Sequence, residues 1–122
     1  MNIEECYEEL GGNCSEIKMR LTGIGLIDKF LVKFLDDKSF DTLCRQMECG
    51  NREEAFRAAH TLKGICANLS FSRLLASVSG LTEELRPASE TNSVSYKAID
   101  MLSDVRRDYE VTADAIRRYL GQ

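Results

Sequence analysis

Apolar residues recur at steps of three and four along most of this chain, and this spacing most narrowly limits its fold. The segment from 26 to 36 shows the pattern in five apolar residues: Ile27, Phe30, Leu31, Phe34 and Leu35. Such spacing places the apolar side chains on one face of a helix. No stretch of alternating β-branched residues competes with it, and the chain has one Pro and no Trp. The pattern predicts an all-α protein.

Residues typical of helix ends divide this pattern into segments. Asn13 and Asn51 are each followed three positions later by Glu, as at many helix N-termini. Ser39 and Ser70 are further candidate caps, and Gly50 is expected to end a helix. We predict an antiparallel four-helix bundle with extra short N-terminal helices. A single domain would span 1–122, with bundle helices at about 39–49, 51–69, 70–86 and 93–120, and N-terminal helices within 3–36 packing on them.

Composition argues against several classes of partner. The net charge is −4, and the arginines are scattered among acidic residues, whereas nucleic-acid binding requires a basic face. The N-terminus lacks the basic region and the apolar region that form a signal peptide. The longest apolar stretch, 24–35, is interrupted by charged residues and is too short for a transmembrane helix. We therefore expect a soluble, cytoplasmic protein without nucleic-acid or membrane partners. The start at Met1 and the finish just after Leu120 suggest a complete stand-alone protein.

The five cysteines do not form a recognisable framework. Their number is odd and no Cys-x-x-Cys occurs, so neither a disulfide scaffold nor a zinc site is expected. We interpret them as buried, reduced thiols: Cys6, Cys14, Cys44, Cys49 and Cys66.

The predicted helix 51–69 carries the single His of the chain, His60. At about 100° per residue, one face of this helix collects the residues expected in the core. These are Ala55, Ala58, Ala59, Leu62, Ile65, Cys66 and Leu69. His60, Lys63, Gly64 and Ala67 lie on the opposite face, so we predict that His60 points to solvent.

The neighbouring residues Gly64 and Lys63 indicate what an exposed His60 could do. A Gly inside an exposed helix costs about 1 kcal/mol relative to Ala, so helix formation does not explain Gly64. One turn from His60, Gly64 would leave room for another protein to reach the imidazole. Lys63 can bring an ammonium group to an anion attached to the ring. A nucleophilic imidazole, a cation and a smooth surface together suit transient phosphoryl transfer.

The same residues carry a family resemblance. His-Thr-Leu-Lys-Gly at 60–64, followed by Asn68 and Leu69, resembles the signature His-x-Leu-Lys-Gly-x-x-x-x-Leu-Gly of histidine-containing phosphotransfer (HPt) domains. Tyr-Glu-Glu-Leu-Gly-Gly at 7–12 and the segment 30–35 resemble the leading helices of stand-alone members, so the match covers nearly the whole chain. The resemblance implies that His60 is the phosphoacceptor, that Lys63 assists the phosphoryl group and that Gly64 provides clearance.

Two positions depart from the family pattern. Ser70 stands where the family usually has Gly, and because Ser is a good N-cap we expect the turn to survive. Family members often place Glu or Gln on the following helix, where it accepts a hydrogen bond from the imidazole. That position here is Thr82, with Glu83 beside it, so these two residues are the candidates for orienting the ring.

The resemblance also implies a role and partners. His60 would accept a phosphoryl group from a receiver-domain aspartate and pass it to another receiver. The protein would need no cofactor of its own, since the receiver brings its bound Mg²⁺. The partners would be response-regulator receiver domains, with a hybrid histidine kinase as a further candidate. Because the chain has no kinase nucleotide loop or catalytic loop, we expect a phosphocarrier and not an enzyme.

Docking is expected on the surface around His60, and a monomer would keep this face open. The helical wheel assigns six residues to that surface: Glu53, Phe56, Arg57, Ala67, Asn68 and Phe71. One alternative is a helical adaptor that binds receiver or kinase domains without being phosphorylated. A metal or redox protein using His60 and the cysteines is less favoured, because Cys66 lies on the core face; no metal site is expected.

Overall fold

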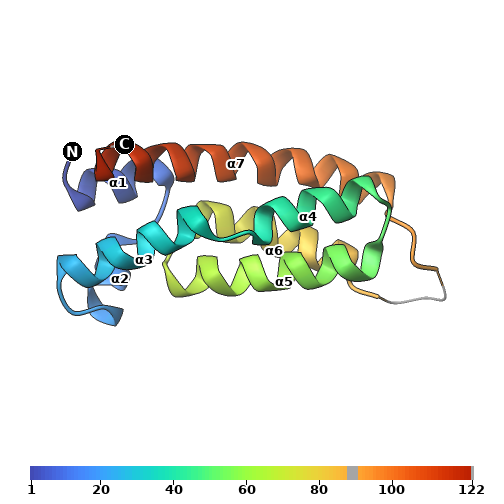
Figure 1. Cartoon of the computed structure of the whole chain (residues 1–122), viewed down its shortest axis with the longest axis horizontal. Helices are drawn as coiled ribbons and strands as arrows, with labels where there is room; N and C mark the ends of the chain where they lie inside the picture. Colours follow the sequence, from blue (N-terminus) through green and yellow to red (C-terminus); the bar gives the residue numbers. More distant parts are fainter. Residues whose placement is uncertain (88–90, 122) are drawn as a thin grey trace.

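The computed structural model describes residues 1–87 and 91–121, and the chain is helical throughout most of this part (Figure 1). The described residues form seven helices and no strand: α1 (Ile3–Leu10), α2 (Cys14–Arg20), α3 (Ile24–Asp36), α4 (Ser39–Glu48), α5 (Arg52–Asn68), α6 (Ser72–Leu85) and α7 (Tyr96–Leu120). None of these helices is both long and apolar enough to cross a membrane. The predicted all-α bundle is confirmed.

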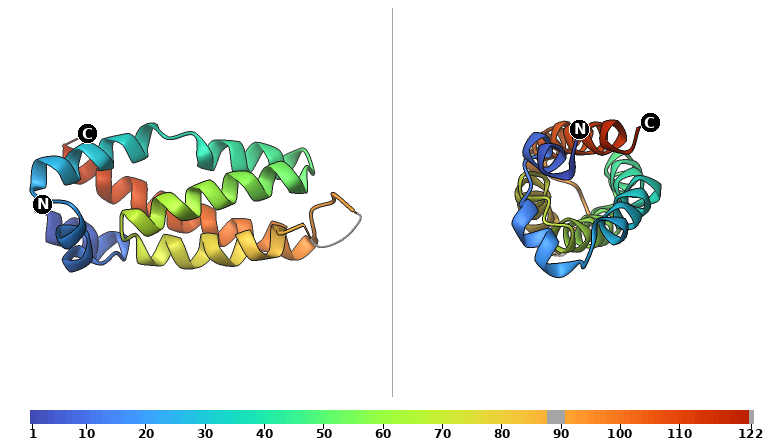
Figure 2. Two further views of the ribbon diagram at one scale, coloured as in Figure 1. Left: turned by 90° about the horizontal axis from the view of Figure 1, so that it is seen from below. Right: turned by 90° about the vertical axis from the view of Figure 1, so that its left-hand side faces the viewer.

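Helices α4 to α7 form the bundle, and successive helices run in opposite directions (Figure 1). The 25 residues of α7 span about 37 Å, whereas the 10 residues of α4 span about 15 Å. Helix α3 lies in line with α4 and covers the remaining length of the bundle, while α1 packs beside the C-terminal end of α7 (Figures 1 and 2). The helices before α4 therefore complete the core at one end.

Aromatic contacts join these N-terminal helices to the bundle. The ring of Tyr109 on α7 stacks on Phe40 of α4, with centroids 3.9 Å apart, and contacts Phe34 of α3 at 5.6 Å. At the end of the bundle, the Tyr119 hydroxyl donates a hydrogen bond to Asp28 of α3 at 2.6 Å. Helix α3 is thus fixed along the C-terminal half of α7.

The caps predicted from Asn and Gly are confirmed, but the Ser39 cap is wrong. Asn51 accepts a hydrogen bond from the Glu54 N–H, and Gly50 ends α4 in the left-handed conformation with φ 72°. At the start of α4, the carboxylate of Asp37 accepts the hydrogen bond from the Ser39 N–H at 2.8 Å. The Ser39 side chain makes no capping bond there, because Lys38 occupies the N-cap position.

Ser70 ends α5 and does not cap α6, so that prediction is also wrong. Its φ of 58° is left-handed, and the Phe71 N–H donates to the Cys66 carbonyl at 3.0 Å. This is the helix-ending motif that usually has Gly at the left-handed position. The Ser70 hydroxyl donates to the Glu16 carboxylate at 2.8 Å, which joins the turn to α2. Helix α6 consequently begins at Ser72, with Phe71 as its N-cap residue.

All five cysteines are free thiols, but they are not all buried. Cys6 and Cys66 are fully enclosed, and burial raises the pKa of Cys6 to about 11 and that of Cys66 to about 12. Cys14 and Cys44 are half-buried, and Cys49 is exposed at the C-terminus of α4. The expectation of burial therefore holds for two of the five and is wrong for Cys49.

Candidate functional site

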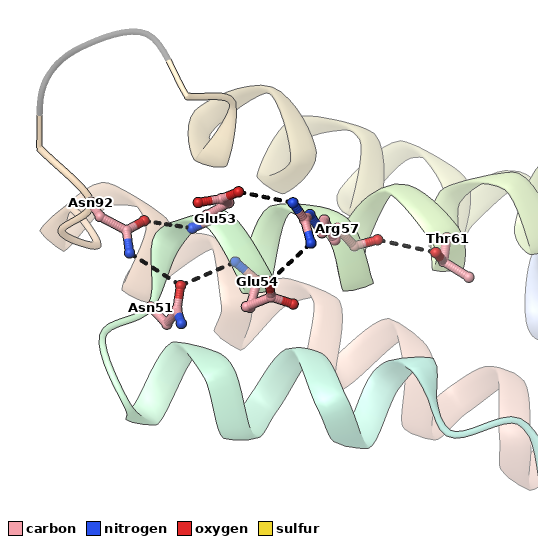
Figure 3. Close-up of polar contacts among 6 residues, drawn as sticks. All are labelled: Asn51, Glu53, Glu54, Arg57, Thr61 and Asn92. Atoms are coloured by element: carbon pink, nitrogen blue, oxygen red, sulfur yellow. Dashed lines mark hydrogen bonds and ion pairs between the residues drawn. The ribbon is translucent and has the colours of Figure 1, made fainter.

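Both ends of α5, the helix that carries His60, are fixed by hydrogen bonds. At the start, the Asn92 side chain reaches from the segment before α7, accepts from the Glu53 N–H at 2.7 Å and donates to Asn51 at 3.2 Å (Figure 3). The Asn51 side chain accepts a hydrogen bond from the Glu54 N–H. Two side-chain oxygens therefore bind N–H groups of the first turn, which have no partner within the helix. The Ser70 turn ends the helix as described above. His60 therefore lies on a rigid element.

The two faces of α5 are those that the helical wheel predicts, except that Ile65, predicted in the core, is half-buried. Small side chains dominate the buried face, where Ala55, Ala58, Ala59, Leu62 and Cys66 are each at most 7% exposed. These alanines bring α4 and α6 close to α5. His60 is exposed near the middle of the helix. The predicted solvent exposure of the imidazole is confirmed.

A hollow of about 410 Å³ borders the imidazole, and its lining residues are Phe56, Arg57, His60, Thr61 and Arg86. The Phe56 and His60 rings lie one helical turn apart with centroids 5.9 Å from each other. The Arg86 guanidinium lies over the Phe56 ring, 5.2 Å from its centroid. The hollow is thus lined by the aromatic ring of Phe56 and by the cationic side chains of Arg57 and Arg86.

Arg86 is a site residue that sequence reasoning missed. It follows α6, and no local pattern links it to His60; only the packing of α6 on α5 brings it to the hollow. Its guanidinium forms two hydrogen bonds to Glu83, at 3.1 and 2.8 Å. These bonds hold the pKa of Glu83 below its usual value, and the charge of Lys63 adds a smaller effect in the same direction.

Arg57 also lines the hollow. Two carboxylates bind its guanidinium (Figure 3). It pairs with Glu53 at 2.9 Å and with Glu54 at 3.1 Å, at the acidic first turn of α5. The Thr61 hydroxyl donates to the Arg57 carbonyl at 3.1 Å and is occupied within the helix. Arg57 therefore has two carboxylate partners, whereas Lys63 forms no ion pair with the described residues.

Gly64 is not required by the fold. A Cβ added at Gly64 would meet nothing within 4 Å, and the residue is not in the left-handed region. At Gly12, by contrast, an added Cβ would lie 2.7 Å from the Ser70 carbonyl oxygen. Close packing requires a Gly at position 12, but no contact within the protein requires one at position 64. The bare backbone one turn from His60 is therefore a feature of the surface.

The residues predicted to orient His60 do not do so in this structure. Thr82 is fully buried, and its hydroxyl donates to the Val78 carbonyl at 2.7 Å. Glu83 is bound to Arg86, and no hydrogen bond joins either residue to the imidazole in the part of the chain that is described. Phe56 is the ring's aromatic neighbour.

The predicted docking residues are on the surface, with one exception. Glu53, Arg57 and Asn68 are exposed, while Phe56 and Ala67 are half-buried. Phe71 is fully buried, so its place on the docking face is wrong. The left-handed turn at Ser70 directs Phe71 inward, where it packs against Phe34 at 5.0 Å and Tyr7 at 5.9 Å.

Fold and site together define a helical-bundle protein with one exposed histidine and two arginines that line the same hollow. The family model described as the Hpt domain matches residues 27–115, which include His60, so the chain belongs to the Hpt domain family. Hpt domains are phosphocarrier modules of two-component signalling, generally not enzymes, and they interact with response-regulator receivers. Comparisons with curated proteins and with solved structures found no match.

Proposed function

We propose that this protein is a phosphorelay intermediate in which His60 accepts a phosphoryl group from a receiver-domain aspartate and passes it to another receiver. The observation that carries the proposal is an exposed His60 one turn from Gly64, a helical glycine that the fold does not require. A glycine without an internal role is explained by the approach of a partner to the ring.

The chemistry needs one free nitrogen of a neutral imidazole. Its lone pair attacks the phosphorus of the phosphoaspartate, an N–P bond forms, and the P–O bond breaks. The aspartate carboxylate leaves with the electron pair, while the second ring nitrogen keeps its proton. The same steps in reverse transfer the group to the next receiver.

Two cations of this chain would stabilise the transferring group. Lys63 lies one turn from His60 without an ion pair in the described residues, and Arg86 borders the same hollow. Arg86 is paired with Glu83 in the absence of a phosphoryl group, and that exposed pair is weak enough to exchange partners. The receiver would supply Mg²⁺ at its own aspartate, so no metal site is needed on this chain.

The receiver would dock over the surface that continues from Gly64 towards the C-terminal end of α5. Ala67 and Asn68 present small or polar side chains there. Beside them lies an apolar hollow of about 420 Å³ between α5 and α3, lined by Arg20, Leu21, Phe30, Lys33, Asp37, Ile65, Asn68 and Leu69. We expect a small contact that forms and separates quickly, as a relay requires.

The test is transfer of label from a phosphorylated, Mg²⁺-bound receiver of the same genome. We expect an acid-labile, alkali-stable label on the wild-type chain and none on His60→Gln. Since the chain contains one His, loss of the label identifies the acceptor without ambiguity.

A non-phosphorylated adaptor is the competing function, and the lack of a hydrogen bond from Thr82 or Glu83 to His60 is the observation that favours it. If several receivers bind the chain, yet neither they nor a small-molecule phosphodonor such as phosphoramidate labels it, the relay proposal is wrong and the adaptor replaces it.

A further inference from the structure

Arg52 is a basic residue in an unfavourable place for its own helix. It is the first residue of α5, where the positive end of the helix dipole disfavours a cation. No carboxylate in the described part of the chain pairs with it. Its position is therefore not explained by the stability of α5.

The Arg52 guanidinium instead serves the end of α6. It donates hydrogen bonds to three consecutive carbonyl groups: Glu84 at 3.2 Å, Leu85 at 3.1 Å and Arg86 at 2.8 Å. A cation is favourable at this end of a helix, where carbonyl groups have no partner within the helix. Arg52 thus acts as the C-terminal cap of a neighbouring helix.

Pro87 ends helix α6, but the last carbonyl groups of this helix lack the usual cap. No Gly follows it, and Pro87 has no N–H to donate to the last carbonyls. Arg86 itself leaves the helix with an extended backbone, φ −54° and ψ 126°. Pro87 favours this extended backbone, and Arg52 supplies the hydrogen bonds that the carbonyl groups lack.

The segment that follows returns to the same helix end. The Arg52 N–H donates to the Asn92 carbonyl at 3.2 Å, and the Asn92 side chain caps Glu53 (Figure 3). The chain before and after the α6–α7 connection is therefore attached to the first turn of α5, four residues before Phe56.

We propose that Arg52 is a positioning residue of the phosphotransfer site. By holding the backbone carbonyl of Arg86, it places the Arg86 guanidinium over Phe56, in the hollow that His60 also lines. Arg52 does not line the hollow and acts through Arg86. Its effect on phosphoryl transfer rests on the proposed function, whereas its effect on the position of Arg86 does not.

The position of Arg86 is measured first, by nuclear magnetic resonance without any phosphodonor. The Phe56 ring shifts the side-chain proton resonances of Arg86, and Phe56→Leu defines the unshifted positions. In Arg52→Gln we expect the Arg86 resonances to move towards those of Phe56→Leu. Arg52→Lys keeps the charge but cannot reach three carbonyls, so we expect an intermediate shift. Unchanged Arg86 resonances in both folded variants would overturn the proposal.

The effect on transfer is measured as a double-mutant cycle with a phosphorylated receiver. Arg52→Gln should lower the initial rate of labelling about three- to tenfold, and should have no further effect in an Arg86→Gln background. Arg45→Gln is the matched control, because Arg45 is an exposed arginine whose guanidinium donates only to Thr42 within the described residues. Equal losses from Arg52→Gln in both backgrounds would overturn the action through Arg86.

The two experiments separate the proposals. A wild-type chain that takes no label from any donor removes the relay function, but the Arg86 resonances still report whether Arg52 positions that residue. If the resonances move as expected and the rate does not, Arg52 holds Arg86 without a role in transfer, and the assignment to the phosphotransfer site is wrong.

Discussion

The rings of Phe56 and His60 lie one turn apart on α5, with centroids 5.9 Å from each other and planes inclined at 49°. The Arg86 guanidinium lies over the Phe56 ring, 5.2 Å from the ring centroid. One half-buried aromatic side chain therefore contacts both the candidate phosphoacceptor and a candidate cation. Phe56 is thus the residue of the hollow that lies next to both groups.

Replacing Phe56 by Leu should impair phosphoryl transfer more than folding. Leu retains the apolar bulk but lacks the aromatic face that attracts Arg86, an interaction of about 0.5–1 kcal/mol at an exposed site. We expect the rate of labelling by a phosphorylated receiver to fall about two- to fivefold, measured in rapid-quench experiments. Tyr96→Leu removes an aromatic ring that is 89% exposed on α7 and serves as the control. Equal rates in wild type and Phe56→Leu would contradict this role.

Gly64 should show opposite effects on stability and on transfer. Gly64→Ala is expected to raise the free energy of unfolding by about 0.5–1 kcal/mol, because Gly is the poorer helix former and an added Cβ meets nothing within 4 Å. Gly64→Gln should slow labelling by a receiver at least tenfold, since its side chain covers the approach to His60. Urea unfolding and transfer kinetics measure the two effects.

A small phosphodonor provides the control for Gly64. Phosphoramidate needs no docking surface, so we expect it to label His60 in wild type and in Gly64→Gln at similar rates. If Gly64→Gln slows both donors alike, the glycine acts on the imidazole itself and not on the approach of a partner.

The faces of α5 could be predicted from sequence because they depend on local periodicity alone. A helix repeats every 3.6 residues, so the buried alanines and the exposed His60 follow from spacing. The same method wrongly placed Phe71 on the surface, because the wheel of one helix does not extend across the turn between the predicted helices 51–69 and 70–86. A single left-handed residue, with φ 58°, redirects the chain at that point. The conformation of one Ser is not encoded in an apolar pattern.

The place of Arg86 in the site could not be predicted from the sequence, for a different reason. Its distance from His60 depends on how α6 packs against α5, and on the Arg52 guanidinium that holds its carbonyl. Both are tertiary contacts between segments that have no shared periodicity. The family signature did not supply this residue either, since it covers the His, Lys and Gly of α5 and the turn that follows.

The strain at Ser70 can be measured with two substitutions. A left-handed conformation costs a residue with a Cβ about 1–2 kcal/mol and costs Gly nothing comparable. Ser70→Ala keeps this cost and loses the hydrogen bond to Glu16, so we expect a loss of about 1 kcal/mol of stability. Ser70→Gly loses the same bond but removes the cost, so it should be more stable than Ser70→Ala by about 1 kcal/mol. Equal stability of the two variants in urea unfolding would contradict the left-handed turn.

Two buried thiols should make the protein less stable at alkaline pH. Burial raises the pKa of Cys66 to about 12 and that of Cys6 to about 11, whereas both thiols ionise near 9.0 in the unfolded chain. Because the folded pKa is raised, their contribution is complete below pH 9 and is lost as the pH rises towards the folded values. Each thiol should lower the free energy of unfolding by about 1.4 kcal/mol per pH unit in that range.

The comparison of pH 8 with pH 10 in urea unfolding tests this effect, and Cys66→Ala isolates one of the two thiols. The variant is expected to be less stable at both pH values because it leaves a small cavity, but its loss between them should be smaller by about 1.4 kcal/mol. Thiolate absorbance gives an independent measurement on the folded protein. If all five thiols ionise near pH 9, Cys6 and Cys66 are accessible to water and the predicted pH dependence does not arise.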